Sequence, residues 1–129
     1  MLNLTFTTVK LQSKHKDLTI YLLNQLYRNI TVDFALNGFD GYIKIHENNP
    51  KIVILDLVMP GITGLDFLRN IKLNNKLNSL KVLIVSAYLD DSMRRELKKL
   101  GVDGIITKPV NKAELKEKCD ELLGVGAKQ

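Results

Sequence analysis

The chain has 129 residues, of which 45% are apolar and 26% are charged, and it carries a net charge of +5. This size and composition predict a single globular domain over residues 1–129, and the presence of only one cysteine, Cys119, excludes an internal disulfide framework. The sequence shows neither a signal-peptide pattern nor an apolar run long enough to cross a membrane, so we expect a cytoplasmic protein with no membrane partner. The modest positive charge permits an acidic partner but does not require one.

Strand-like and helix-like segments alternate from the N-terminus onward. Residues 4–11 predict a first strand, the weakest of the set because it contains threonines and a lysine. Residues 15–30 follow with helical spacing, in which Leu18, Leu22 and Leu26 form one apolar stripe and Leu23, Tyr27 and Ile30 lie beside it.

The next segments include the clearest strand of the chain. Residues 31–36 predict a short second strand, and a second helix is expected to open at Asn37-Gly38 and to end near Pro50. Residues 51–56, KIVILD, form an apolar run that ends in a carboxylate. Such a run is typical of a parallel strand that is buried on both faces.

The second half of the chain continues the alternation. Its predicted elements are, in chain order, a helix over 64–76, a strand over 79–87, a helix capped by Asp90 or Asp91 and ended at Gly101, a strand over 103–110, and a helix that opens with Asn111 and Glu114 in the pattern of a capping box.

Five strands that alternate with five helices predict an α/β fold with a parallel sheet covered by helices on both faces and right-handed crossovers. A doubly wound, flavodoxin-like (βα)5 domain commonly has the strand order 2-1-3-4-5, and it binds ligands beyond the carboxyl ends of the strands, where the chain reverses direction. Asp56 closes the third strand, Ser86 the fourth and Lys108 the fifth. We therefore expect these three polar residues to meet at one edge of the sheet.

The three residues suit phosphoryl transfer. A carboxylate such as that of Asp56 can attack a phosphoryl group and form an acyl phosphate, a reaction that needs an in-line approach and positive charge around the phosphoryl oxygens. Lys108 can pair with one of these oxygens, and the Ser86 hydroxyl can donate a hydrogen bond to another.

At this point the chain resembles the receiver domains of two-component response regulators. The residues that match are Asp56 with Met59, Pro60 and Gly64 after it, Ser86 and Ala87 after an apolar strand, and Lys108 and Pro109 near the end. The resemblance implies that Asp56 is the phosphoacceptor, with Val58, Met59 and Ala87 as its pocket neighbours. It also implies that Ser86 and Lys108 contact the phosphoryl group and that the Lys108-Pro109 peptide bond is cis.

The N-terminal part departs from the family pattern. Receiver domains usually end strand 1 with two acidic residues that hold Mg²⁺, whereas a gapless alignment places Leu11 and Gln12 there, or Gln12 and Ser13 after a shift of one residue. The first acidic residue of the whole chain is Asp17. Since Mg²⁺ prefers carboxylate and water oxygens, we expect weak Mg²⁺ binding or none, and no other cofactor.

Two smaller departures concern the switching residues of the family. An aromatic residue is common three residues before the lysine, and this chain has Ile105 there, which cannot make the ring rotation that accompanies the hydroxyl shift. Val58, two residues after Asp56, is apolar, so we expect slow hydrolysis of any acyl phosphate that forms.

Each of these residues also has a purely structural interpretation. Asp56 and Lys108 could form a structural ion pair, and Ser86 could be a strand-end hydroxyl bonded to backbone. The basic run that contains Arg94, Arg95, Lys98 and Lys99 is either a solvated helix face or a surface for a partner.

Two hypotheses for the function follow. In the first, the domain accepts a phosphoryl group from a histidine kinase or a phosphotransfer protein and then binds a downstream protein through its fourth helix, fifth strand and fifth helix; it is not a turnover enzyme, and homodimerisation is left open. In the second, it is a pseudo-receiver that binds proteins without being phosphorylated. A flavin or nucleotide enzyme is disfavoured because residues 10–16 contain no glycine and one hydroxyl, and a nucleic-acid partner because basic and aromatic residues are not interleaved.

Overall fold

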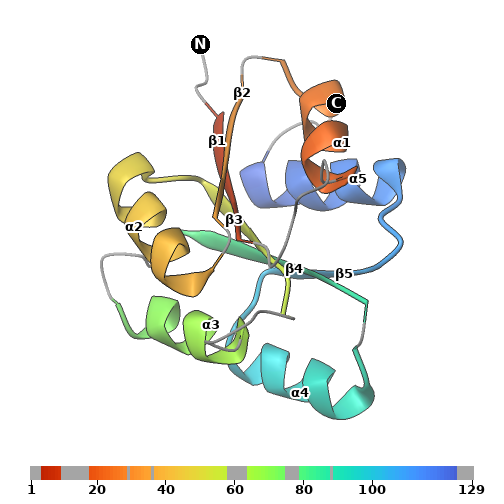
Figure 1. Cartoon of the computed structure of the whole chain (residues 1–129). Helices are drawn as coiled ribbons and strands as arrows, with labels where there is room; N and C mark the ends of the chain where they lie inside the picture. The colour runs from red at the N-terminus through yellow and green to blue at the C-terminus, as the bar shows by residue number, and fades with distance from the viewer. Residues whose placement is uncertain are drawn as a thin grey trace.

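The computed structural model describes residues 4–9, 18–28, 30–35, 37–57, 64–74, 79–87 and 89–124, and the structural statements below refer to these residues. Five parallel strands form one sheet in the order β2-β1-β3-β4-β5 (Figure 1), which confirms the predicted topology. The strands are β1 (Leu4–Val9), β2 (Ile30–Ala35), β3 (Ile52–Leu55), β4 (Lys81–Ser86) and β5 (Gly104–Thr107).

Helices cover both faces of this sheet. They are α1 (Leu18–Leu26), α2 (Gly38–Asn48), α3 (Gly64–Leu73), α4 (Asp91–Lys99) and α5 (Lys112–Leu123). Figure 1 shows α1 and α5 on one side of the sheet and α2 and α3 on the other, with α4 following α3. The domain therefore has the three-layer, doubly wound arrangement that the alternation of elements predicts.

The two central strands contribute side chains to both halves of the core. Val53 and Leu55 of β3 pack with α2, α3 and α4, whereas Ile52 and Ile54 pack with α1 and α5. Successive side chains of a strand point to opposite faces of the sheet, so a continuous apolar run can fill both layers at once. All four residues of β3 are buried, so the carboxylate of Asp56, the next residue, lies at the edge of the core.

Polar side chains and one glycine fix the ends of several helices. Asp90 rather than Asp91 caps α4, because the Asp90 carboxylate accepts a hydrogen bond from the backbone N–H of Met93 at 2.7 Å. The side-chain oxygen of Asn111 accepts hydrogen bonds from the N–H groups of Ala113 and Glu114 at the start of α5. Gly101 follows α4 with a φ of 78°, a conformation that glycine adopts without a steric penalty.

The helix predicted over 15–30 is described as α1 over Leu18–Leu26, with Ile30 already in β2, and its apolar stripe is only partly buried. Leu22 and Leu23 are buried, but Leu18 is 50% exposed. Helical spacing gives the direction of a side chain around the axis, but it does not show how far the neighbouring elements extend along the helix. Leu18 is the first residue of α1, one turn before the buried pair, and it lies beyond the packed part of the interface.

No helix in the described ranges combines the length and the apolar composition that crossing a membrane would require.

The lone cysteine lies in the core between α1 and α5. Cys119 is fully buried, and burial together with the neighbouring Asp120 raises the pKa of its thiol from 9.0 to about 12. Tyr27 donates a hydrogen bond to Asp120 at 2.7 Å, and burial and this bond raise the pKa of the Tyr27 phenol as well. Both groups are therefore held in their neutral forms in the folded state.

These raised pKa values predict resistance to alkylation and a loss of stability at high pH. At pH 8, iodoacetamide should leave folded Cys119 unmodified and should modify it fully in guanidinium chloride, as followed by intact mass. The pKa of the Cys119 thiol is higher in the folded state than in the unfolded state, so the neutral thiol stabilises the fold at pH values below about 9. This contribution is lost as the pH rises from about 9 toward 12. The Cys119→Ala variant should show a shallower decline in this range, whereas rapid modification of the folded parent would contradict the burial.

Candidate functional site

Asp56, Ser86 and Lys108 meet at the carboxyl edge of three adjacent strands. Asp56 directly follows β3, Ser86 is the last residue of β4, and Lys108 directly follows β5. Because β3, β4 and β5 are neighbours in a parallel sheet, their carboxyl ends lie side by side. The structure therefore brings together the residues that the strand order was expected to unite.

The closest contact in this group is an ion pair. The Lys108 ammonium donates to the Asp56 carboxylate at 2.7 Å, and the side chain of Asp56 is only 13% exposed while that of Lys108 is 32% exposed. The backbone N–H of Lys108 also donates to the backbone oxygen of Ser86 at 3.0 Å, and the Lys108-Pro109 bond is cis, as the resemblance implies. The lysine is thus held both to the end of β4 and to the carboxylate.

The Ser86 hydroxyl is the most unusual polar group at this edge. It is fully buried, and its oxygen has no hydrogen-bond partner among the residues that the structure describes. A buried hydroxyl that lacks a partner costs about 1–3 kcal/mol. A serine satisfied by backbone would not show this, so the structural interpretation of Ser86 finds no support in the described contacts. A ligand oxygen near Asp56 would give the hydroxyl an acceptor.

The structure adds Arg94 and Thr107 to the site's surroundings. A terminal guanidinium nitrogen of Arg94 in α4 donates to the Thr107 hydroxyl at 2.9 Å, and Thr107 immediately precedes Lys108. Sequence reasoning missed this contact, because neither residue belongs to a recognisable motif and only the packing of α4 beside β5 brings them together.

Of the remaining predicted site residues, the structure describes Ala87 and Ile105 only. Ala87 is exposed next to Ser86, and Ile105 on β5 is partly buried and packs against the core on the α4 side. The positions predicted for the pocket neighbours Val58 and Met59, and for the metal pair Leu11 and Gln12, lie outside the described residues. The structure therefore shows where Asp56, Ser86 and Lys108 lie, and the roles of all the predicted site residues stay predictions.

Within the part of the chain that the structure describes, no group of three or more histidine, cysteine, aspartate or glutamate side chains could hold a metal ion. β1 ends at Val9, whose partner on β3 is Leu55, the residue before Asp56. The residues that follow Val9 are the ones that could supply a carboxylate beside Asp56, yet residues 10–16 include no aspartate or glutamate. The residues that follow Val9 lie outside the described residues, so weak or absent Mg²⁺ binding stays a prediction.

The profile of the response regulator receiver domain matches residues 13–120. The chain belongs to this family. It is 30% identical over 107 residues to the chemotaxis protein CheY-3 of Vibrio cholerae, covering 78% of this chain and 82% of that protein. It is 35% identical over 88 residues to the chemotaxis protein CheY of Pseudomonas aeruginosa, covering 68% of this chain and 71% of that protein.

Solved receiver structures share the fold. The signal receiver domain of the DNA-binding response regulator merR from Colwellia psychrerythraea superposes with a TM-score of 0.86 at 23% identity, covering 95% of this chain and 99% of that one. At this identity the likeness concerns the fold alone. Together with the family match it establishes the domain as a receiver module of two-component signalling.

Proposed function

We propose that Asp56 is the phosphoacceptor of this receiver domain and that Lys108 and Ser86 bind the phosphoryl group. The observation that supports this most directly is the Lys108–Asp56 ion pair at 2.7 Å, beside a buried serine hydroxyl that has no partner among the described residues. A structural ion pair between Lys108 and Asp56 does not explain why the Ser86 hydroxyl is buried without a partner among these residues. In this proposal the domain is a signalling module that accepts a group, and it is not an enzyme that turns over a substrate.

The proposed step is a displacement at phosphorus. A carboxylate oxygen of Asp56 attacks the phosphorus of a phosphohistidine on a kinase or phosphotransfer protein, the P–N bond breaks, and the imidazole keeps the electron pair and takes up a proton. Lys108, already held beside the carboxylate, balances the charge of the phosphoryl oxygens. The Ser86 hydroxyl donates to one of these oxygens and so gains the acceptor that it lacks.

The donor set predicts the behaviour toward metal. We expect no saturable Mg²⁺ binding at or below about 1 mM, which corresponds to roughly 4 kcal/mol of binding free energy, because no carboxylate precedes Asp17 in the sequence. Isothermal titration of the parent with MgCl₂ measures this directly. Saturable binding below that concentration would show that acidic residues from elsewhere complete the site.

A specific observation favours a second candidate function, that of a pseudo-receiver. Phosphoryl transfer without a metal loses much of its charge compensation, and the Lys108–Asp56 pair already neutralises the carboxylate. A module of this kind would keep the receiver fold and bind its partners in one constitutive state.

Phosphodonor labelling distinguishes the two functions. We expect incubation with acetyl phosphate to add the mass of one phosphoryl group to the parent, to the same extent with and without Mg²⁺, and to add nothing to Asp56→Asn. Lys108→Ala should slow the labelling by about 100-fold, since removing one preorganised charge donor has an effect of this order. A parent that stays unlabelled at long times, while a metal-dependent receiver domain is labelled under the same conditions, would establish the pseudo-receiver.

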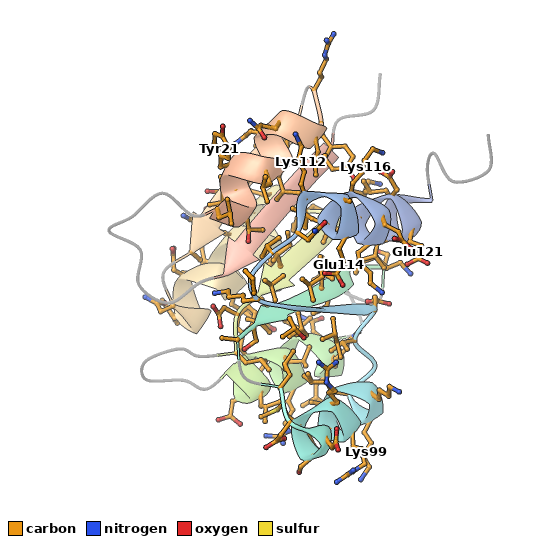
Figure 2. All side chains as sticks on the ribbon, turned by 90° about the vertical axis from the view of Figure 1, so that its right-hand side faces the viewer. Tyr21, Lys99, Lys112, Glu114, Lys116 and Glu121 are labelled. Carbon is orange, nitrogen blue, oxygen red and sulfur yellow. The ribbon has the colours of Figure 1, made fainter. Side chains whose placement is uncertain are left out.

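The proposed surface for a downstream protein consists of α4, β5 and α5. Arg95, Lys98 and Lys99 on α4 are exposed, whereas Arg94 is bonded to Thr107 and so connects this helix to the residue before Lys108. Figure 2 labels Lys99 on α4 and Glu114 and Glu121 on α5, of which Lys99 and Glu121 are exposed and Glu114 is partly buried. A change at Lys108 could be transmitted to α4 through Thr107 and Arg94, and this surface could serve another protein or a second copy.

A further inference from the structure

Ser86 and Thr107 are neighbours on one face of the sheet. They pair with each other in the parallel register of β4 and β5. Two positions before them on the same strands, Ile84 and Ile105 pack in the half of the core that contains Leu97 of α4. Alternate side chains of a strand share a face, so the side chains of Ser86 and Thr107 both lie on the side of the sheet that α4 covers.

The two hydroxyl groups differ in their surroundings. Ser86 is fully buried and its oxygen has no hydrogen-bond partner among the described residues, whereas Thr107 is exposed and accepts a hydrogen bond from Arg94 at 2.9 Å. Neighbouring strands lie about 4.8 Å apart, so a rotation about the Cα–Cβ bonds can bring one hydroxyl within hydrogen-bond distance of the other. The bond from Arg94 uses a lone pair of Thr107 and leaves its hydroxyl proton free to be donated to Ser86.

The contacts of α4 hold the Arg94 side chain in place, and this side chain is itself partly buried. The Asp90 carboxylate caps the helix, and Leu97, three residues after Arg94, is fully buried. Glu96 forms an ion pair with Arg69 of α3 at 3.0 Å. The guanidinium is therefore held beside the carboxyl end of β5, and a donor that is already in position needs no rearrangement during a reaction.

These groups can donate hydrogen bonds in one continuous direction. A guanidinium only donates, whereas a hydroxyl donates and accepts at the same time. With a phosphoryl group on Asp56, the Ser86 hydroxyl donates to a phosphoryl oxygen and its own oxygen accepts from Thr107, which accepts from Arg94. The chain then begins at a positive charge and ends at a negative one, and each hydrogen bond polarises the next. It is completed only when the phosphoryl group supplies the last acceptor.

We propose that Arg94 is a positioning residue for phosphoryl transfer and acts through the hydroxyls of Thr107 and Ser86. This inference rests on the proposed function of Asp56 as the phosphoacceptor. Lys108 contacts the Asp56 carboxylate directly at 2.7 Å, so Arg94 supplies a second positive charge, which acts on the phosphoryl oxygens through the two hydroxyls. We call the hydrogen-bond chain from Arg94 to Ser86 the hydroxyl relay.

The rate of labelling by acetyl phosphate, followed by intact mass, tests the hydroxyl relay. In this reaction a carboxylate oxygen of Asp56 bonds to phosphorus, and acetate leaves with the electron pair of the P–O bond. Arg94→Met and Thr107→Val should each slow labelling by about fivefold, the change expected when one neutral hydrogen bond that stabilises the bound phosphoryl group is lost. Thr107→Ser, which keeps the hydroxyl, should be labelled faster than Thr107→Val.

Matched variants separate the relay from a structural role of Arg94. Arg28→Met makes the same substitution at an exposed arginine two residues before β2, at the amino edge of the sheet, and should be labelled at the rate of the parent. In a Ser86→Ala background, Arg94→Met should cause no further slowing, because the group that contacts the phosphoryl oxygen is already absent. A structural role of Arg94 would instead slow labelling by the same factor in both backgrounds. Melting curves show that each variant is folded.

Two results would overturn the hydroxyl relay and leave the proposed function of Asp56 intact. The first is a parent that is labelled no faster than Arg94→Met. The second is equal slowing by Arg94→Met with and without the Ser86 hydroxyl. A parent that stays unlabelled, while a metal-dependent receiver domain is labelled under the same conditions, would instead overturn the phosphoacceptor role of Asp56 and the relay together.

Discussion

Gly64→Ala is expected to lower the free energy of unfolding by about 2–3 kcal/mol. Gly64 is the first residue of α3, and a Cβ atom added there would lie 2.6 Å from the Cα and 2.8 Å from the backbone oxygen of Leu57. Backbone atoms cannot rotate away as a flexible side chain can, so α3 would have to move off the end of β3. Alanine gains at most about 1 kcal/mol of helix propensity over glycine, which is less than the cost of this overlap.

A thermal or urea unfolding curve measures the effect. Gly101→Ala serves as the matched control, because Gly101 has a φ of 78° and a Cβ added there meets no atom within 4 Å. Its cost should be limited to the strain of a left-handed alanine, about 1–2 kcal/mol. If Gly64→Ala proved more stable than Gly101→Ala, then the start of α3 would not be held against Leu57, and the approach of α3 to the residue after Asp56 would need revision.

The central strands show what the sequence could predict. The apolar run that forms β3 predicts burial on both faces, and the strand period then sends Val53 and Leu55 to one half of the core and Ile52 and Ile54 to the other. Local chemistry also predicts a cap at Asp90 or Asp91, of which the structure selects Asp90, and a cap at Asn111, because a side-chain acceptor before a helix satisfies backbone N–H groups that have no other partner. These features depend on neighbouring residues only, and they are confirmed.

The contact between Asp56 and Lys108 could not be predicted from local sequence patterns alone. The two residues are 52 positions apart, so no local pattern connects them, and their contact was predicted from the strand order that α/β domains favour. The Arg94–Thr107 bond was not predicted. It depends on how deeply α4 packs beside β5, and helical spacing alone does not give that depth, as the exposed Leu18 of α1 also shows.

The site itself can be tested by restoring the acidic pair. The double variant Leu11→Asp, Gln12→Asp places two carboxylates at the positions that the gapless alignment assigns to the Mg²⁺ ligands of the family. In metal-free buffer we expect it to be less stable than the parent, because like charges close to Asp56 repel one another and raise one another's pKa. Any core packing lost with the Leu11 side chain would add to this decrease.

Mg²⁺ should reverse the loss. An ion that binds only the folded state stabilises it by mass action, by about 2.7 kcal/mol at 100 times its dissociation constant, so the melting temperature of the variant should rise with Mg²⁺ while that of the parent stays constant. Labelling by acetyl phosphate should then exceed that of the parent, should require Mg²⁺, and should vanish when Asp56→Asn is added. Melting curves and intact mass on the same samples measure both effects.

The observed strand register supplies a companion variant. Since Val9 pairs with Leu55, the residues that directly follow Val9 in the sequence are Lys10 and Leu11. The variant Lys10→Asp, Leu11→Asp therefore covers an alignment shifted by one residue toward the N-terminus, opposite to the shift that gives Gln12 and Ser13. It also removes a cation that could help Lys108 to balance Asp56. A gain of Mg²⁺-dependent stability in either variant means that the acidic pair is what this site lacks for binding Mg²⁺. If both variants fold and neither gains stability or labelling, the loss extends beyond the two carboxylates to the course of the chain after β1, and the pseudo-receiver becomes the better account of this domain.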